Sequence, residues 1–574
     1  MIDPRYDTLQ VLFADRVFRI PAYQRFYSWL PKQREDLFSD LIELAKRSGD
    51  QHHFMATIVC YKTSEITPVG ASQYRLYDVV DGQQRLTTLI ILMKCIELEL
   101  ADGSDDKRDL SRILVKKDGL LILLQTNNAN AHIFNRFIRE GIEPEAKELQ
   151  THSDRNLRGA ISDCKKFLYK WNQTRDTLSL LRLILNRLGF VVYDTDDSRA
   201  VYTLFEVLNS RGLAVDWLDK TKSVLMGKAY ELGSTPLAQQ AEVESLQKIW
   251  RQIYTELARE DLSGDEILRI AATLYYGPGQ GKPRSAEESL ELLRKACQLP
   301  SDPTKISERL LAVAQKLSTL YSNVQLSAVT DIFQARLLAV AIMSAHGVDE
   351  KERDKLLEQW ERVTFRIFGL FGKDSRTKVG DYVKIGFKIV TNDLETRTYN
   401  QIMGQLRALG TEYPITSAVE VGLVGKDFYE SPEACRYLLW NYEEYLTSTA
   451  GPGATYDEHE RSSIWKERAS DSIEHIYPQH PEANGPWKAK LTNDEGVLEQ
   501  PQQHVGRVGN LILLPSPLNS EAQAKSFPEK RQIYSKHNLR MIGEVVKQPD
   551  WTLYSIKERE TTIVAWAKAR WADI

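Results

Sequence analysis

Cysteine is scarce in this 574-residue chain, and its five cysteines lie far apart with no CxxC pair among them. They stand mostly within apolar stretches, which favours buried, reduced thiols and excludes a zinc site built from cysteine pairs. No run of about 18 uninterrupted apolar residues occurs, so no membrane span is expected. The first residues lack the basic and apolar regions of a secretory signal, and we therefore expect a cytoplasmic protein.

A strong charge of either sign is also lacking, because 75 basic residues nearly balance 79 acidic ones for a net charge of −4. Any contact with nucleic acid must then come from local patches rather than from the protein as a whole. Internal repeats and low-complexity tracts are absent as well. The remaining composition is that of an ordinary globular protein.

The chain is too long for one hydrophobic core, and its length predicts about three to four domains. Strand-like runs at 54–61, 76–80 and 189–193 alternate with helical patterns in its first part. From about 235 to 445 the pattern is almost wholly helical, and a stretch rich in Gly, Pro and Thr then resembles a linker. We predict an α+β, predominantly helical protein with a mixed α/β region over 1–230, a helical region over 231–446 and a C-terminal region over 447–574.

A carboxylate beside a histidine, followed by two asparagines in turn-flanked apolar segments, stands out in the C-terminal region. These residues are Glu474, His475, Asn510 and Asn519. A histidine can deprotonate water near neutral pH, and a carboxylate with an amide oxygen can hold one hard divalent cation. This combination of residue types is suited to cleaving a phosphodiester.

The surrounding sequence predicts a strand, a turn, a second strand and a helix. Segment 472–477 is β-compatible, and segment 506–514 is a turn that leads into another strand. Ser516 is expected to cap the helix, which places Asn519 in the first turn and directs it back at the hairpin.

Two further features bear on this region. Neighbouring residues of an ideal strand face opposite sides, so Glu474 and His475 converge only if the strand end is bent. Residues 504–540 carry more basic than acidic side chains, which suits a phosphate backbone. The basic residues are Arg507, Lys525, Lys530, Arg531, Lys536 and Arg540, against Glu521 and Glu529.

The order of these residues resembles that of the HNH nucleases, whose ββα-metal unit carries an acid–histidine pair, a central asparagine and a final histidine or asparagine. The resemblance implies that Glu474 is the first metal ligand and His475 the general base. It also implies that Asn510 holds the loop that orients the histidine and that Asn519 is the second metal ligand. Mg²⁺ or Mn²⁺ suits such oxygen ligands better than zinc. The alternative is a core histidine with asparagines that cap turns, but four positions in order favour the nuclease.

A second candidate site is the segment DGQQR at residues 81–85, where a predicted strand passes into a predicted helix. Such a junction exposes backbone N–H groups at the positive end of the helix dipole and can bind an anion. Gly82 permits close backbone approach, Arg85 can bind phosphate oxygens in a fork, and Asp78 or Asp81 could help to hold Mg²⁺. Taken alone, the segment is as consistent with a capped helix that carries a surface arginine as it is with an anion-binding site.

Two other segments favour the functional interpretation. Residues 20–29 place Gln24 and Arg25 among aromatic side chains, a composition able to stack on a base and to bind phosphate. Glu206 and Asn209 lie three residues apart in a predicted helix and are therefore neighbours on its surface. Each feature alone is also compatible with ordinary packing.

Together the segments IPxYQRxYxW, DGQQRLTTL and FExLNSRG resemble the signatures of a ParB/sulfiredoxin-like domain, in which DGQQR binds and hydrolyses a nucleotide. The resemblance implies catalytic roles in hydrolysis for Gln84 and Arg85. It implies nucleotide contacts from Gln24, Arg25, Asp81, Gly82, Gln83, Gln84, Arg85, Glu206 and Asn209. The combination with a C-terminal HNH unit is similar to GmrSD-type modification-dependent restriction enzymes and related phage-defence nucleases, over about residues 10–230 and 440–574.

Our leading hypothesis is an endonuclease of a restriction or anti-phage system that cuts DNA, including modified phage DNA, with Mg²⁺ or Mn²⁺ under the control of a nucleoside triphosphate. The sequence does not distinguish GTP, ATP, UTP and CTP. One alternative is a nucleotide-switched DNA-binding regulator whose HNH domain does not cut. Another is that the first domain reads modified DNA directly and that NTP hydrolysis is secondary. A nuclease with one HNH site per chain would gain from forming a homodimer.

Overall fold

The computed structural model folds as two compact units. The first unit comprises Met1–Ala272 and Arg284–Ser318, and the second comprises Thr273–Pro283 and Thr319–Ile574. The residues described are 3–14, 16–47, 53–69, 72–116, 121–126, 131–197, 200–201, 216–260, 262–277, 281–323, 326–450, 463–482 and 484–574. The boundaries expected near residues 230 and 446 stay predictions.

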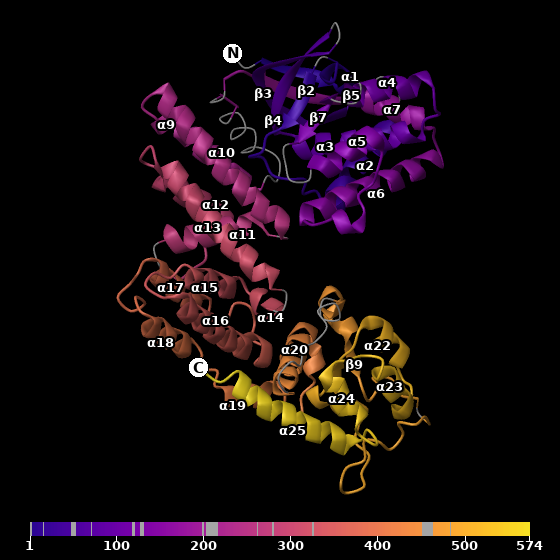
Figure 1. Ribbon diagram of the computed structural model, residues 1–574, viewed down its shortest axis with the longest axis vertical. Coiled ribbons are helices and arrows are strands. Elements are labelled where there is room, and N and C mark those ends of the chain that lie inside the picture. Colours follow the sequence, from indigo (N-terminus) through magenta and orange to yellow (C-terminus); the bar gives the residue numbers. More distant parts are fainter. Residues whose placement is uncertain are drawn as a thin grey trace. The chain divides into compact units, whose positions relative to one another are not determined.

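A mixed six-stranded sheet lies at the centre of the first unit (Figure 1), in the order β1-β8-β3-β4-β2-β7. Its strands are β1 (Asp3–Thr8), β2 (Arg16–Ile20), β3 (His53–Val69), β4 (Ser72–Asp81), β7 (Leu124–Thr126) and β8 (Leu188–Thr195). β3 and β4 form an antiparallel pair, whereas β2 runs parallel to β4 and β8 runs parallel to β3. The three strands predicted from the sequence are β3, β4 and β8, and each is longer than expected.

Helices complete the first unit. They are α1 (Leu9–Leu12), α2 (Pro31–Lys46), α3 (Gln83–Glu99), α4 (Asp105–Leu114), α5 (Ala131–Glu140), α6 (His152–Asn172), α7 (Thr177–Arg187), α9 (Trp217–Leu232), α10 (Pro236–Arg259) and α12 (Ala286–Ala296). Helices α11 (Gly264–Tyr275) and α13 (Asp302–Ser322) each contain a boundary between the units. The predicted helical spacing after β4 is confirmed by α3, whose Leu86, Leu89, Ile90 and Met93 belong to one apolar core with residues of the sheet and of α2, α6 and α7.

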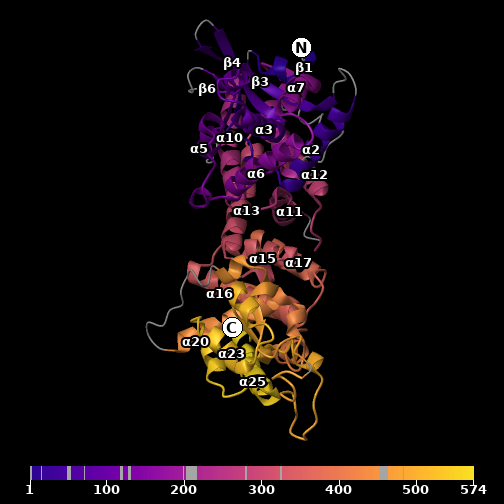
Figure 2. The same cartoon turned by 90° about the vertical axis from the view of Figure 1, so that its right-hand side faces the viewer.

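The second unit is helical apart from one short strand pair among its described residues. Its helices are α14 (Ser327–Thr330), α15 (Phe333–Met343), α16 (Glu350–Thr364), the π-helix η3 (Phe365–Leu370), α17 (Val379–Val390), α18 (Tyr399–Leu409), α19 (Ile415–Gly422), α20 (Pro432–Thr449), α22 (Ser516–Ala522), α23 (Phe527–Tyr534), α24 (Arg540–Val546) and α25 (Leu553–Arg570). Figure 2 shows α20, α23 and α25 gathered in one part of this unit. No helix that the structure describes combines the length and apolarity that crossing a membrane requires.

The start of α22 differs from the prediction by one residue. Ser516 is the first residue of the helix, and its N-cap is Pro515, which offers no side-chain cap. The backbone N–H of Ser516 instead donates to Glu467 Oε2, at 2.9 Å. A carboxylate from a distant segment therefore accepts a hydrogen bond from the first backbone N–H of the helix. The local sequence could not reveal this partner.

Candidate functional sites

The strands β9 (Ile473–His475) and β10 (Leu511–Leu513) pair antiparallel and carry part of the C-terminal candidate site. Leu511 lies opposite His475, and Ile512 lies opposite Glu474. All six strand residues are buried. Helix α22 follows β10, so strand, strand and helix succeed one another in the order expected from the sequence.

Asn510 is fully buried and uses its whole side chain to hold the segment after His475. Its Oδ1 accepts from the Tyr477 backbone N–H at 2.8 Å and from Trp551 Nε1 at 3.0 Å. Its Nδ2 donates to the carbonyl oxygens of Tyr477 and Val505, both at 2.9 Å. These four hydrogen bonds use the capacity of the amide, so Asn510 fixes the backbone and has little left for a ligand.

Asn519 is directed at the strand pair, as the sequence predicted. Its Nδ2 donates to the carbonyl oxygens of Asp471 and Ile473, at 2.9 and 3.1 Å. Its Oδ1 accepts no hydrogen bond from any residue that the structure describes. The amide is thus anchored through nitrogen, with its oxygen left for a cation or a polar ligand.

A cavity of about 650 Å³ brings three of the predicted residues together. Glu474, His475 and Asn519 all line it, with Tyr429 and Asp471 among their neighbours. Nowhere in the described part of the chain do three His, Cys, Asp or Glu side chains cluster as a metal centre. The oxygen donors that line this cavity, Asn519 Oδ1 and the carboxylates of Glu474 and Asp471, are of the kind that could hold Mg²⁺.

His475 is only 7% exposed, and its Nε2 has no hydrogen-bond partner among the described residues. The edge of its ring meets Tyr429, with ring centroids 4.4 Å apart. Burial, with a smaller contribution from the Lys530 charge, lowers the pKa of His475 to about 3. The imidazole is therefore neutral near pH 7, the state that a general base requires, while a pKa this low makes it a weak proton acceptor in this environment.

The low pKa of His475 predicts a loss of stability in acid. Between pH 6.5 and 3 the unfolded chain binds a proton at this residue that the folded chain does not, so the free energy of unfolding falls as the pH falls below 6.5. From pH 7 to 5.5 the contribution is about 1 kcal/mol. Urea unfolding of the second unit in EDTA should show this extra loss in the wild type and not in His475→Gln. An equal loss of unfolding free energy in both proteins would contradict the low pKa of His475.

Glu474 is held by two side chains from α23. Its Oε1 accepts from Lys530 Nζ at 2.6 Å and from Tyr534 Oη at 2.7 Å. Lys530 Nζ also donates to the carbonyl oxygen of His475, at 2.7 Å. Burial raises the pKa of Glu474, and the neighbouring ammonium opposes that rise. No side chain that the structure describes donates to Oε2, so a cation could reach this carboxylate through that oxygen.

The local excess of basic residues is smaller than the sequence suggested. Arg507 pairs with Glu560 of α25, Lys530 with Glu474, and Lys536 with Glu521. Three of the six cations are thus neutralised, two of them by carboxylates outside the counted segment. The electrostatic case for a phosphate backbone at this segment is correspondingly weaker.

In the first unit, β4 passes into α3 through Gly82, the N-cap residue, which has φ +90°. A Cβ added at Gly82 would lie 3.1 Å from Ile58 Cγ1 and 3.4 Å from the carbonyl oxygen of Thr57. The Gly82 N–H donates to Asp81 Oδ1 at 2.8 Å. Both the left-handed conformation and the crowding require glycine here.

The glutamines of this segment hold backbone in the structure. Gln84 accepts from the Ser28 N–H and donates to the Phe26 carbonyl, both at 3.0 Å. Gln83 donates to the Arg25 carbonyl at 3.3 Å, and its buried Oε1 has no partner among the described residues. These bonds join α3 to residues 25–28, so the two motifs that the sequence places about 60 residues apart form one structure.

Gln24 links the same segment to α9. Its Nε2 donates to the carbonyl oxygen of Val80 at 3.1 Å, and its Oε1 accepts from the buried Lys222 Nζ at 2.7 Å. Burial lowers the pKa of Lys222 to about 8. The amide of Gln24 is therefore committed to protein partners on both sides.

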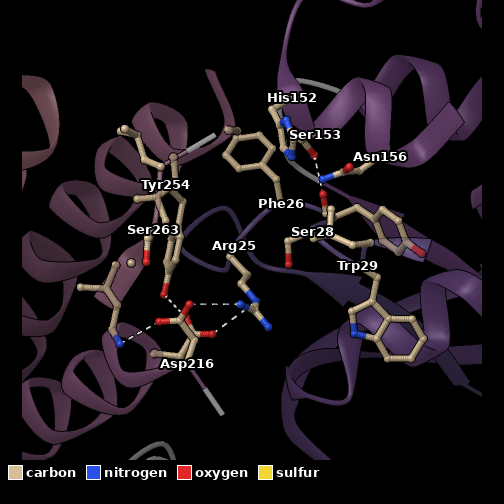
Figure 3. A pocket seen from close by; sticks show the side chains of 18 of the residues that line it. Arg25, Phe26, Ser28, Trp29, His152, Ser153, Asn156, Asp216, Tyr254 and Ser263 are labelled. Carbon is tan, nitrogen blue, oxygen red and sulfur yellow. Dashed lines mark hydrogen bonds and ion pairs between the residues drawn. The ribbon is translucent and has the colours of Figure 1, made fainter. Parts of the chain in front are cut away.

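A cavity of about 400 Å³ lies beside residues 25–29 (Figure 3). Arg25 points across it toward two acidic residues, with Nε 3.3 Å from Asp219 Oδ2 and Nη1 3.6 Å from Asp216 Oδ2. Burial and the charge of Asp219 raise the pKa of Asp216 to about 6. Tyr254 of α10 also donates to Asp219.

The sequence predictions did not include the two acidic residues that line this cavity, Asp216 and Asp219. Asp216 and Asp219 lie three residues apart where α9 begins, a spacing that places both on one helix face, and this spacing could have indicated them.

Arg85 stands next to this region with its charge unpaired. Its guanidinium lies 6.0 Å from the ring centroid of Trp29, and it forms no hydrogen bond or ion pair with any described residue. Burial lowers the pKa of Arg85, while the charges of Asp81 and Asp40 oppose that shift. A partly buried cation that makes no direct ion pair with the described residues is a favourable place for an anionic ligand.

The aromatic residues near Arg25 have different surroundings. Tyr27 is buried, and its hydroxyl bonds to Thr88, so it belongs to the core. Phe26 and Trp29 line the cavity, and Trp29 is partly exposed. Glu206 and Asn209 lie outside the described residues.

Comparison with known families matches two regions of the chain. Residues 9–226 match the GmrSD restriction endonuclease N-terminal domain, and residues 414–566 match the GmrSD restriction endonuclease C-terminal domain. A search of curated proteins found no match. The two matched regions contain the two candidate sites and cover most of the sequence. The chain belongs to the GmrSD restriction endonuclease family and is a restriction nuclease.

Proposed function

We propose that the second unit is a metal-dependent DNA endonuclease with an HNH-type ββα-metal site, and that a nucleoside triphosphate bound by the first unit controls its cutting. The observation that carries the proposal is the neutral His475, whose Nε2 is unpartnered and which lines the same cavity as Glu474 and Asn519. A base and two oxygen donors in one cavity are what phosphodiester hydrolysis requires.

Each residue has a separate role in this proposal. His475 accepts the proton of the attacking water, and Asn510 holds the segment that orients it. Asn519 Oδ1 and Glu474 would hold Mg²⁺ or Mn²⁺, which when bound supplies Lewis-acid stabilisation of the charge that develops on the phosphate. Tyr429 limits the rotation of the imidazole by contact with its ring.

For the first unit we propose a ParB/sulfiredoxin-like domain that binds and hydrolyses a nucleoside triphosphate. The unpaired Arg85 and the N-terminus of α3 at Gly82 would bind phosphate, and the partly exposed Trp29 would stack on the base. Gln83 and Gln84 support this site by fixing residues 25–28.

A cleavage panel tests the whole proposal. The purified chain should cut DNA with Mg²⁺ or Mn²⁺, lose all cutting in EDTA, and change its rate when GTP, ATP, UTP or CTP is added. The substrates should include unmodified, methylated, glucosylated and phosphorothioated DNA, because the preferred modification is open. If none of these substrates is cut with either metal, whichever nucleotide is added, the proposed nuclease activity is refuted.

One observation favours a second function, a nucleotide-switched DNA-binding regulator whose HNH unit does not cut. Lys530 already neutralises Glu474, which leaves the proposed metal site with less negative charge. This function predicts that NTP changes the affinity for DNA while the DNA stays intact. A third possibility is that the cavity beside Trp29 reads modified DNA directly, which would appear as binding of modified DNA without NTP.

We further propose that the nuclease acts as a homodimer, because a double-strand break needs two HNH sites and the chain carries one candidate. Light scattering after gel filtration should then report twice the 65.8 kDa chain mass in the presence of DNA. Double-strand cutting by a strict monomer would contradict this.

A further inference from the structure

Two side chains of α23 converge on one oxygen of the nuclease cavity. Lys530 and Tyr534 are four residues apart on α23, and neighbours at this spacing lie on one helix face. Both donate to Glu474 Oε1, at 2.6 and 2.7 Å. The Lys530 side chain is completely inaccessible to solvent, with the Trp487 ring centroid 5.8 Å from Nζ. A cation buried this deeply is stable only because specific partners surround it.

Lys530 contacts both halves of the acid–histidine pair. Adjacent strand residues project to opposite sides, yet Glu474 and His475 both line the cavity. Lys530 Nζ donates to the Glu474 carboxylate and, at 2.7 Å, to the backbone carbonyl of His475. One ammonium group therefore fixes the side chain of the first residue and the backbone of the second.

We propose that Lys530 and Tyr534 are positioning residues of the nuclease site, which immobilise Oε1 of Glu474 and leave Oε2 as the single carboxylate oxygen for a divalent cation. The proposal rests on the proposed function of the second unit. With Oε1 engaged by two donors, Glu474 binds through one oxygen, and the second ligand is Asn519 Oδ1. Residues that orient a metal ligand in this way influence metal affinity without touching the metal.

A purely structural role for the pair makes a different prediction. If Lys530 and Tyr534 only stabilised the fold, their loss would lower the melting temperature and leave the metal affinity of the folded protein unchanged. If they position Glu474, their loss raises the dissociation constant for the metal even in protein that is fully folded. Metal binding in the absence of DNA separates the two roles.

The test measures Mn²⁺ binding to the metal-free, full-length chain by electron paramagnetic resonance, and the Mg²⁺ dependence of DNA cleavage. Tyr534→Phe removes one donor and keeps the buried ring. We expect about a 10-fold rise in the Mn²⁺ dissociation constant and in the Mg²⁺ concentration for half-maximal cleavage, at the low end of the 10–100-fold range for such residues. Tyr534→Phe carries the test, because Lys530→Met removes a positive charge beside the metal ligand together with the donor, and these two changes act on cation affinity in opposite directions.

Tyr437→Phe is the matched control, because Tyr437 is also a buried tyrosine whose hydroxyl donates to a glutamate, Glu361, at 2.5 Å. It should bind Mn²⁺ like the wild type. Wild-type Mn²⁺ affinity in folded Tyr534→Phe would overturn the positioning role while leaving the nuclease intact. A wild-type chain that neither binds Mn²⁺ nor cuts DNA would refute the proposed function, and the positioning role with it.

Discussion

Replacing His475 with alanine is expected to abolish DNA cleavage while leaving nucleotide hydrolysis by the first unit unchanged. The imidazole is neutral near pH 7 and its Nε2 has no hydrogen-bond partner among the described residues, so it is a candidate base in the cavity. Loss of a general base lowers the rate by about 10²–10⁴-fold. The rate of plasmid cleavage at saturating Mg²⁺ measures the effect, and the release of phosphate from the nucleotide measures the first unit.

His504→Ala provides the control for His475→Ala. His504 is a second buried histidine of the same unit, but it bonds to Glu499 at 2.7 Å and is not among the residues that line the cavity. A general loss of structure would affect both variants, whereas loss of the base affects only the first. Cleavage by His475→Ala at the wild-type rate would exclude His475 as the base.

The part of this site that the sequence predicted is the part that depends on local backbone. The strand before Pro478, the turn before Leu511 and the helix that carries Asn519 each follow from a few adjacent residues, and the structure contains all three. The pairing of β9 with β10 and the bond from Asn519 to the Ile473 carbonyl then bring His475 and Asn519 to one cavity, although residues 476–510 separate the two strands. The local pattern therefore predicted the elements, whereas the pairing that brings them together joins segments far apart in the chain.

The partners of Glu474 could not be predicted in the same way. Lys530 and Tyr534 lie 56 and 60 residues further along the chain, and as a sequence pattern they are an ordinary pair on an amphipathic helix. Lys530 was counted as part of a basic patch for DNA, although it is buried against a carboxylate. A charge count along the chain cannot distinguish a solvated cation from a buried one, because burial is a property of packing.

The first unit shows a similar limit. The DGQQR segment was correctly placed at a strand–helix junction, where Gly82 adopts a left-handed conformation. The sequence could not show whether Gln84 would face a ligand or a backbone, since an amide can bond to either. In the structure its amide bonds to Phe26 and Ser28, whereas Arg85 forms no hydrogen bond or ion pair with the part of the chain that the structure describes. The two adjacent motif residues therefore have different surroundings, and their variants should differ.

Arg85→Ala is expected to lower NTP hydrolysis by about 10²–10³-fold, the usual cost of losing one donor to a developing negative charge. The melting temperature should stay close to that of the wild type, because the guanidinium forms no hydrogen bond or ion pair with the described residues and only packs near Trp29. Phosphate release and nucleotide binding by calorimetry measure the first effect, and thermal unfolding measures the second. Wild-type hydrolysis by this variant would remove Arg85 from the nucleotide site.

Gln84→Ala separates support of the site from direct contact with the nucleotide. It leaves the part-buried Ser28 N–H and the buried Phe26 carbonyl without their partner, and the loss at the buried carbonyl lowers stability by about 1–3 kcal/mol. Its loss of hydrolysis should therefore accompany a lower melting temperature, in contrast to Arg85→Ala. If Gln84→Ala loses hydrolysis at an unchanged melting temperature, Gln84 acts on the nucleotide itself, and its bonds to residues 26 and 28 break when the nucleotide binds.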